Sequence, residues 1–229
     1  MLILVAHGTR HAGGLHTIGQ LAEAVSARIG LVRTAFVDVL GPNPAEVLSA
    51  TDQPAVVVPA FLASGYHVNT DLPARVVESG HPAVSVTAAL GPDAALAVAM
   101  RDRLREVGWR RGDVVVMAAA GSSDPRAARE LFCAASLLAE YVGEVHVGFV
   151  ATGAPRVPEV VRALRGAGRH RIFIASYLLA PGLFHDRLHT CGATAVSAPI
   201  GVHPAVVDLL VSHFLMPAQQ KSELVADLA

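Results

Sequence analysis

Cysteine, surplus charge and long apolar runs are all scarce in this chain of 229 residues. The two cysteines, Cys133 and Cys191, are too few for a disulfide framework and lack the paired spacing of a zinc site. No apolar run approaches the roughly 18 residues that a membrane helix needs. The opening MLILVAHG has neither the length nor the basic start of a signal peptide. We therefore expect a cytoplasmic protein that does not contact a membrane.

Neither sign of charge prevails, since 18 Lys and Arg face 19 Asp and Glu. This balance argues against the basic footprint of a nucleic-acid-binding protein. Neither a P-loop nor a GxGxxG motif occurs, so no ATP or NAD cofactor is implied. What the chain does have is apolar content, at 52% of residues, which is ample for a real core.

Apolar, β-rich runs alternate with longer segments rich in Ala, Leu and Arg. Uninterrupted apolar strands of this kind are typical of parallel sheets that helices cover on both faces. The eight runs are 2–6, 34–40, 55–61, 83–87, 113–119, 144–150, 171–177 and 194–198, and a helix is expected near 93–107. The pattern predicts an α/β fold built from βαβ units.

The last four runs repeat the first four. LILVAHGTR aligns with VVMAAAGSS, AFVD with GFVA, PAEV with PEVV, AFLASGYH with YLLAPGLF, and LGPDAALAVAMRDRL with IGVHPAVVDLLVSHF, in the same order. Five ordered matches indicate duplication of a four-stranded unit of about 110 residues. We therefore predict two flavodoxin-like parallel-sheet halves over 1–110 and 111–216, divided near GWRRGD, followed by a tail over 217–229.

The two halves differ at three polar positions. Each polar residue of the first half faces an apolar one in the second, the pairs being His7/Ala120, Asp38/Ala151 and His67/Phe184. A purely structural role would be expected to survive in at least one pair, so we interpret these residues as functional and the first half as the one that carries the active site. His185, one place beyond the equivalent of His67, leaves open a shifted histidine in the second half.

All three residues lie at or just beyond the carboxyl ends of predicted strands, where open parallel sheets bind ligands. By analogy with the flavodoxin strand order 2-1-3-4, His7 and His67 flank the crevice, and Asp38 lies on the far side of strand one. Two imidazoles and a carboxylate suit Fe(II), Co(II), Ni(II) or Zn(II). Imidazole also accepts protons near neutral pH.

Three segments carry a family resemblance: LVAHGTR, VVVPAFLASGYHVNTDLP and ASYLLAPGLFHDRL. Together they resemble the sirohydrochlorin chelatases of the CbiX/SirB type, the class II chelatases, over about residues 1–215. The resemblance implies chelatase-type halves and a lyase that inserts Fe2+ or Co2+ into sirohydrochlorin without ATP, for siroheme or cobalamin synthesis. The metal ion is then a substrate, and no cofactor is permanently bound.

The functional histidines of that family carry over onto His7 and His67, which we assign jointly to metal delivery and proton removal. Its acidic residue, usually glutamate, carries over onto Asp38, a shorter carboxylate expected to orient a histidine or attract the cation. The eight carboxylates of sirohydrochlorin require N–H, hydroxyl, amide or cationic donors. The expected substrate contacts are Gly8, Thr9, Arg10, Ser64, Gly65, Tyr66, Asn69 and Thr70. Weaker candidates in the second half are Ser122, Ser123 and His185.

Several alternatives stay open. Thr70-Asp71-Leu72-Pro73 is typical of a helix start, which would give Thr70 a capping role. HGTRH is similar to the Arg-His-Gly motif of histidine phosphatases, although Ala6 stands where their arginine would be. A non-catalytic carrier of tetrapyrrole or metal would use the same pocket without turnover. The sequence does not separate iron from cobalt or nickel. A chain with two halves is expected to act as a monomer, a pseudo-dimer in itself.

Overall fold

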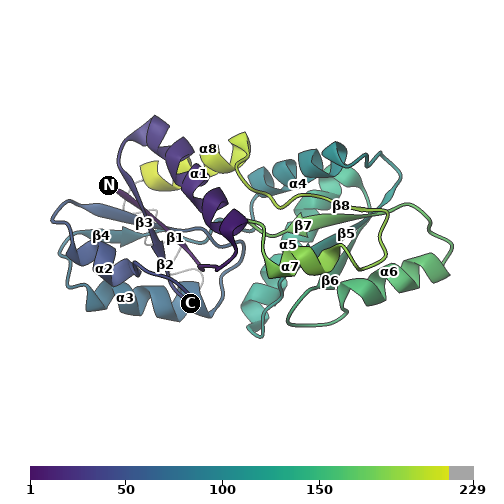
Figure 1. Cartoon of the computed structure of the whole chain (residues 1–229), viewed down its shortest axis with the longest axis horizontal. Helices are drawn as coiled ribbons and strands as arrows, with labels where there is room; N and C mark the ends of the chain where they lie inside the picture. The colour runs from purple at the N-terminus through teal and green to yellow at the C-terminus, as the bar shows by residue number, and fades with distance from the viewer. Residues whose placement is uncertain (217–229) are drawn as a thin grey trace. The chain divides into compact units, whose positions relative to one another are not determined.

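The structure is a computed structural model and describes residues 1–216. Two all-parallel sheets hold four strands each (Figure 1). The first comprises β1 (Leu2–Ala6), β2 (Val32–Phe36), β3 (Ala55–Pro59) and β4 (Val84–Val86), and the second comprises β5 (Val114–Ala119), β6 (Val145–Phe149), β7 (Ile172–Tyr177) and β8 (Ala195–Val196). Their orders are β2-β1-β3-β4 and β6-β5-β7-β8, so the predicted duplicated α/β fold and its strand order are confirmed.

Helices connect successive strands, as parallel pairing requires, and one further helix follows the last strand. They are α1 (Ala12–Ile29), α2 (Pro44–Ser49), the π-helical turn η1 (His67–Asp71) with α3 (Leu72–Glu78), α4 (Ala94–Glu106), α5 (Pro125–Val142), α6 (Val157–Gly166), α7 (Leu183–Leu188) and α8 (Pro204–Leu215). Within residues 1–216, none of the helices combines the length and apolar character that crossing a bilayer requires.

The central strand β1 is buried on both faces. Ile3 and Val5 belong to one apolar cluster, whose other members include Val57, Leu48 and Leu72 from β3, α2 and α3. Side chains alternate along a strand, so Leu2 and Leu4 point to the opposite face, and both are completely buried. Because every position of β1 is in the core, the first polar residue that the strand can present is the one directly after it, His7.

The compact units differ from the predicted halves in one respect. One unit comprises Met1–Leu90 with the last described residues, 206–216, and the other comprises Gly91–Ala205. The last helix of each sequence repeat is therefore exchanged: α4 packs on α5 and β7 of the second unit. In the first unit, Asp208 of α8 pairs with Arg28 of α1. The predicted tail, 217–229, lies outside the described residues.

The exchange has a physical reason that the pattern of apolar residues does not reveal. Leu96, Met100 and Leu104 form a buried stripe on α4, and such a stripe fits either of two equivalent sheets. The partners are decided by tertiary contacts. The Arg103 guanidinium of α4 donates to the Ile200 carbonyl in the second unit at 3.3 Å, and His213 of α8 lies 3.4 Å from the Thr87 hydroxyl in the first.

An ion-pair cluster stabilises α4 within the second unit. Arg101 donates to both carboxylate oxygens of Asp102, at 2.8 and 3.0 Å, and lies over the Tyr141 ring at 5.3 Å. His203 Nε2 lies 3.4 Å from the same carboxylate. The hydrogen bond from Arg101 lowers the pKa of Asp102 below its usual 3.8, although desolvation opposes the shift.

We predict that Asp102→Asn destabilises the protein at neutral pH by about 0.5–1 kcal/mol, the range of partly exposed ion pairs. A lowered native pKa means that the stabilisation is present above the unfolded pKa and disappears as the pH falls through the native one. Urea unfolding at neutral pH and at about pH 3 should therefore show the difference shrinking in acid. Glu140→Gln, at an exposed position of α5, is the charge-matched control. A difference that persists unchanged in acid would contradict the ion-pair explanation.

Candidate functional site

His7 and Asp38 are brought together by the extension of the β1–β2 ladder beyond its last paired residues. The Val37 N–H donates to the Ala6 carbonyl at 3.1 Å, and the Asp38 N–H donates to the His7 carbonyl at 3.0 Å. Both side chains are exposed at this carboxyl edge of the sheet. The pairing explains why residues from two loops are neighbours.

The turn after His7 depends on glycine. Gly8 has φ +96°, a conformation that side chains rarely adopt, and a Cβ there would lie 2.1 Å from the Asp38 carbonyl oxygen. The backbone of the loop after β1 can therefore approach the loop after β2 only because residue 8 has no side chain.

His67 reaches the same edge from the other neighbour of β1. The Ala60 N–H, directly after β3, donates to the Val5 carbonyl at 2.7 Å. The chain then runs through a short loop to η1, where the Leu72 N–H donates to the His67 carbonyl and closes a wide π-helical turn. Turns of this kind are rare and occur often at functional sites.

The two predicted histidines meet. Their ring centroids are 4.8 Å apart and the rings are nearly perpendicular, at 72°. Phe61 lies beside both, with its ring 6.5 Å from that of His7 and 6.2 Å from that of His67. Two neutral imidazoles at this spacing, open to solvent, are able to hold a borderline divalent cation weakly and to accept protons.

Asp71 was not predicted as part of the site. Its carboxylate lies 3.1 Å from Nδ1 of His67 and 3.6 Å from Nε of Arg75. Arg75 also donates to Glu78 at 3.0 Å. The hydrogen bond and charge of Glu78, with the charge of Asp71, raise the pKa of Arg75, which therefore stays cationic. The four residues form a chain of polar contacts along one helical stretch.

Asp38 is placed differently from the sequence-based expectation. Its carboxylate accepts a hydrogen bond from the Val39 N–H at 2.7 Å, and Val39 itself has a positive φ of 69°. In the described part of the chain, no hydrogen bond joins Asp38 to either imidazole. The described residues also contain no group of three or more His, Cys, Asp or Glu side chains arranged to hold a metal ion. Among the described residues, the carboxylate at hydrogen-bond distance from an imidazole of this pair is that of Asp71.

The predicted substrate contacts fall on the loop after β1 and on the stretch that runs from the loop after β3 into η1. Arg10, Tyr66, Asn69 and Thr70 are exposed, and Thr9 and Gly65 are partly so. Ser64 is only 4% exposed, so its side chain faces the interior of its loop. Thr70 is not a helix cap, because the helical turn has already begun at His67 and its side chain makes no capping bond among the described residues.

The second unit repeats this backbone without the polar groups. The Ala151 N–H donates to the Ala120 carbonyl at 3.0 Å, as Asp38 does to His7. His185 Nε2 lies 3.0 Å from the Ser197 carbonyl, and a carbonyl can only accept a hydrogen bond. The ring therefore donates a hydrogen bond to the backbone of the second unit. Ser122 accepts a hydrogen bond from the Asp124 N–H at 3.0 Å, and Ser123 is exposed.

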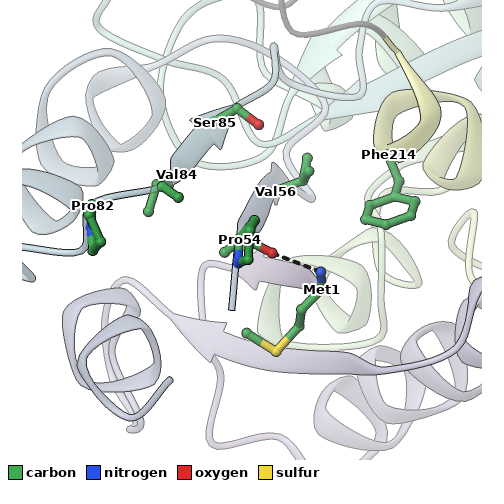
Figure 2. Close-up of a pocket in the computed structure, with 9 residues that line it drawn as sticks. Met1, Pro54, Val56, Pro82, Val84, Ser85 and Phe214 are labelled. Carbon is green, nitrogen blue, oxygen red and sulfur yellow. Dashed lines mark hydrogen bonds between the residues drawn. The ribbon is translucent and has the colours of Figure 1, made fainter. Parts of the chain in front are cut away.

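A hollow of about 470 Å³ lies at the opposite edge of the first sheet. Its walls come from the amino ends of β1, β3 and β4 and from α8, and include Met1, Pro54, Val84 and Phe214 (Figure 2). The Met1 ammonium donates to the Pro54 carbonyl at 2.9 Å there. None of the predicted site residues lines this hollow, because they follow the strands that it precedes. The open edge beside His7 and His67 remains the better candidate on chemical grounds.

Comparison with known proteins gives one family and a consistent fold. The CbiX family model matches residues 1–107 and 114–215. The sirohydrochlorin ferrochelatase of Bacillus subtilis (strain 168) is 26% identical over 200 residues, which are 82% of this chain and 77% of the relative. The structure of SirB from Bacillus subtilis with Fe3+ matches at TM-score 0.83 and 23% identity, covering 97% of this chain and 96% of that one. SirB from Bacillus subtilis subspecies spizizenii in complex with cobalt matches at TM-score 0.78 and 21% identity, covering 97% and 94%.

We predict that Gly8→Ala destabilises the protein by about 2 kcal/mol or more, because the new Cβ meets a backbone carbonyl and the positive φ adds strain. Gly65→Ala is the matched control in the partner loop: a Cβ there meets nothing within 4 Å. Chemical denaturation of the two variants beside the parent protein measures the difference. Equal stabilities for the two variants would show that the close approach at Gly8 is not a constraint.

Proposed function

Because the chain belongs to the CbiX family, we propose that it is an ATP-independent chelatase that inserts Fe2+ or Co2+ into sirohydrochlorin. The observation that supports this most directly is the meeting of His7 and His67, 4.8 Å apart, at an open sheet edge. The names of its relatives agree with this proposal, since they include a sirohydrochlorin ferrochelatase and SirB with Fe3+ and with cobalt.

The chemistry requires two things of the protein. Two pyrrole N–H protons must leave the macrocycle as one divalent ion enters, so the site needs proton acceptors and a weak metal ligand. A neutral imidazole is both, since it has one free lone pair. In the proposal, His7 and His67 share these tasks. Two ligands leave further coordination positions of the ion open to the ring nitrogens, and no permanently bound cofactor takes part.

The surrounding residues fit an anionic, flat substrate. Phe61 offers an apolar ring beside both imidazoles. Arg10, Thr9 and residues 64–70 offer cationic, hydroxyl, amide and backbone N–H donors for the substrate carboxylates. We propose that the chain does this work as a monomer in the cytoplasm, because it carries both repeats of the duplicated unit in one polypeptide.

We predict that His7→Ala and His67→Ala each lower the metal-insertion rate by about 100-fold or more, because each removes a ligand and proton acceptor that the reaction uses directly. Anaerobic visible-absorbance time courses with sirohydrochlorin and Fe2+ or Co2+ measure the rate, and comparing the two ions addresses metal preference. Both side chains are outside the core, so the variants should fold normally. His16→Ala, at an exposed position on α1, and His185→Ala are the controls.

Each outcome of that experiment decides something. Near-normal rates in both site variants would contradict the assignment of His7 and His67. A loss in His185→Ala as large as in His67→Ala would place working residues in both repeats. Tight binding of sirohydrochlorin with no acceleration of metal insertion in the parent protein would favour the non-catalytic carrier.

We predict that Asp38→Asn lowers the rate by less than about 10-fold, a smaller effect than either histidine variant, because the carboxylate bonds the Val39 N–H rather than an imidazole. Asparagine keeps an oxygen that accepts this bond and removes only the charge. The same absorbance assay measures the effect at several metal concentrations. A loss equal to that of His67→Ala would mean that the negative charge itself attracts the cation.

A further inference from the structure

We infer that Asp71 is the positioning residue of this site: it fixes which nitrogen of His67 carries the proton and directs the other nitrogen to the metal ion. The hydrogen-bond assignment rests on the geometry alone. Its consequence for metal insertion rests on the proposed function.

The geometry is specific to one ring nitrogen. Asp71 Oδ2 lies 3.1 Å from Nδ1 of His67, within the range of an N–H···O hydrogen bond. The contact is partly sheltered, with side chains 31% exposed at His67 and 18% at Asp71. A carboxylate is only an acceptor, so the neutral ring must carry its proton on Nδ1. Nε2 is then left with a free lone pair, the form in which imidazole binds metal ions.

The carboxylate is itself held in place. Its other oxygen, Oδ1, lies 3.6 Å from Nε of Arg75, and Arg75 is in turn bound by Glu78. Asp71 is therefore oriented from both sides, by an imidazole and by a guanidinium. A carboxylate that only capped the helix would have no need of His67, and Asp71 in fact makes no capping bond among the described residues.

The second repeat has neither the histidine nor the carboxylate of the His67–Asp71 pair. Aligning AFLASGYH with YLLAPGLF places Phe184 at the position of His67 and Leu188 at the position of Asp71. Leu188 is 2% exposed and belongs to an apolar cluster of the second unit. In the second repeat this stretch forms an ordinary α-helix, α7, with apolar residues in place of the polar pair. Where the histidine is absent, the carboxylate is absent as well.

The two histidines of the site differ in this respect. In the described part of the chain, the ring of His7 has no hydrogen-bond partner, whereas the ring of His67 has one on a defined nitrogen. His185 of the second unit is held through Nε2 by the Ser197 carbonyl, which fixes the opposite tautomer. The protein thus contains a free ring, an Nδ1–H ring and an Nε2–H ring that can be compared in one sample.

Long-range 1H–15N spectra of the histidine rings in the full-length, metal-free protein test the assignment directly. They are recorded at a pH above the titration range of imidazole, so that every ring is neutral. In the parent protein, His67 should give the Nδ1–H pattern and His185 the Nε2–H pattern. In Asp71→Ala, His67 should lose the pure Nδ1–H pattern while His185 keeps its own. His67→Ala identifies the signals.

Enzyme kinetics test the consequence. Asp71→Ala should lower kcat for metal insertion by about 10–100-fold, as for other partners of metal-binding histidines, with little change in KM for sirohydrochlorin. Asp71→Asn should recover part of the loss, because its amide oxygen still accepts from Nδ1–H. Glu78→Gln is the matched control: it breaks the far ion pair of the same helix and leaves the His67–Asp71 contact, so tautomer and kcat should stay near those of the parent.

An unchanged Nδ1–H pattern in Asp71→Ala would overturn the proposal, and so would a changed tautomer with an unchanged kcat. An equal loss in Glu78→Gln would also overturn it, because helix stability would then explain the effect. Should Asp71→Ala fail to fold, Asp71→Leu, which introduces the residue that the second repeat has at this position, removes the acceptor in the same way and is compared with Glu78→Gln. A parent protein that inserts no metal would refute the proposed function, while the spectra would still decide whether Asp71 sets the tautomer of His67.

Discussion

Parallel pairing of β1 with both β2 and β3 is the constraint on which the candidate site depends. It brings the carboxyl ends of three strands to one edge, and two backbone hydrogen bonds continue it into the loops, from Asp38 to His7 and from Ala60 to Val5. Gly8 makes the first of these approaches possible, since any side chain there would meet the Asp38 carbonyl. The position of His7 is thus decided by backbone geometry before any ligand is present.

Much of this was predictable, for physical reasons. Strands buried on both faces leave long apolar runs, and duplication supplies a second copy in which His7 and His67 are replaced by apolar residues. The hydrogen bond of Asp71 was not predictable, because it depends on where a helical turn begins. The pattern Thr70-Asp71-Leu72-Pro73 suggested a helix start at Thr70. The helical turn in fact begins at His67, and this brings the Asp71 carboxylate within hydrogen-bond distance of the His67 ring. The direction of the Asp38 carboxylate likewise follows from a local backbone feature, the positive φ of Val39.

The exchange of α4 and α8 escaped prediction for a different reason. Both helices carry an apolar stripe. Such a stripe predicts that one face of a helix is buried, but it does not indicate which sheet the helix packs against. The result is that the unit with the candidate site is completed by the last described helix of the chain, through contacts such as His213 to Thr87. Sequence repeats and packing units therefore need not coincide. Cutting this chain at the boundary of its repeats would remove a helix from the sheet that carries His7.

The two repeats separate what the fold needs from what the chemistry needs. Both keep the hydrogen bond between the loops after their first two strands, at 3.0 Å, and both keep a glycine whose Cβ would meet a carbonyl of the opposite loop, Gly8 in one and Gly121 in the other. These features persist because the backbone requires them. The polar side chains are present in one copy only, although the second copy forms a sheet of the same strand order with Ala120 and Phe184 in their places. The fold therefore does not require these side chains. Their presence in the first repeat is best explained by a role in binding or converting a ligand.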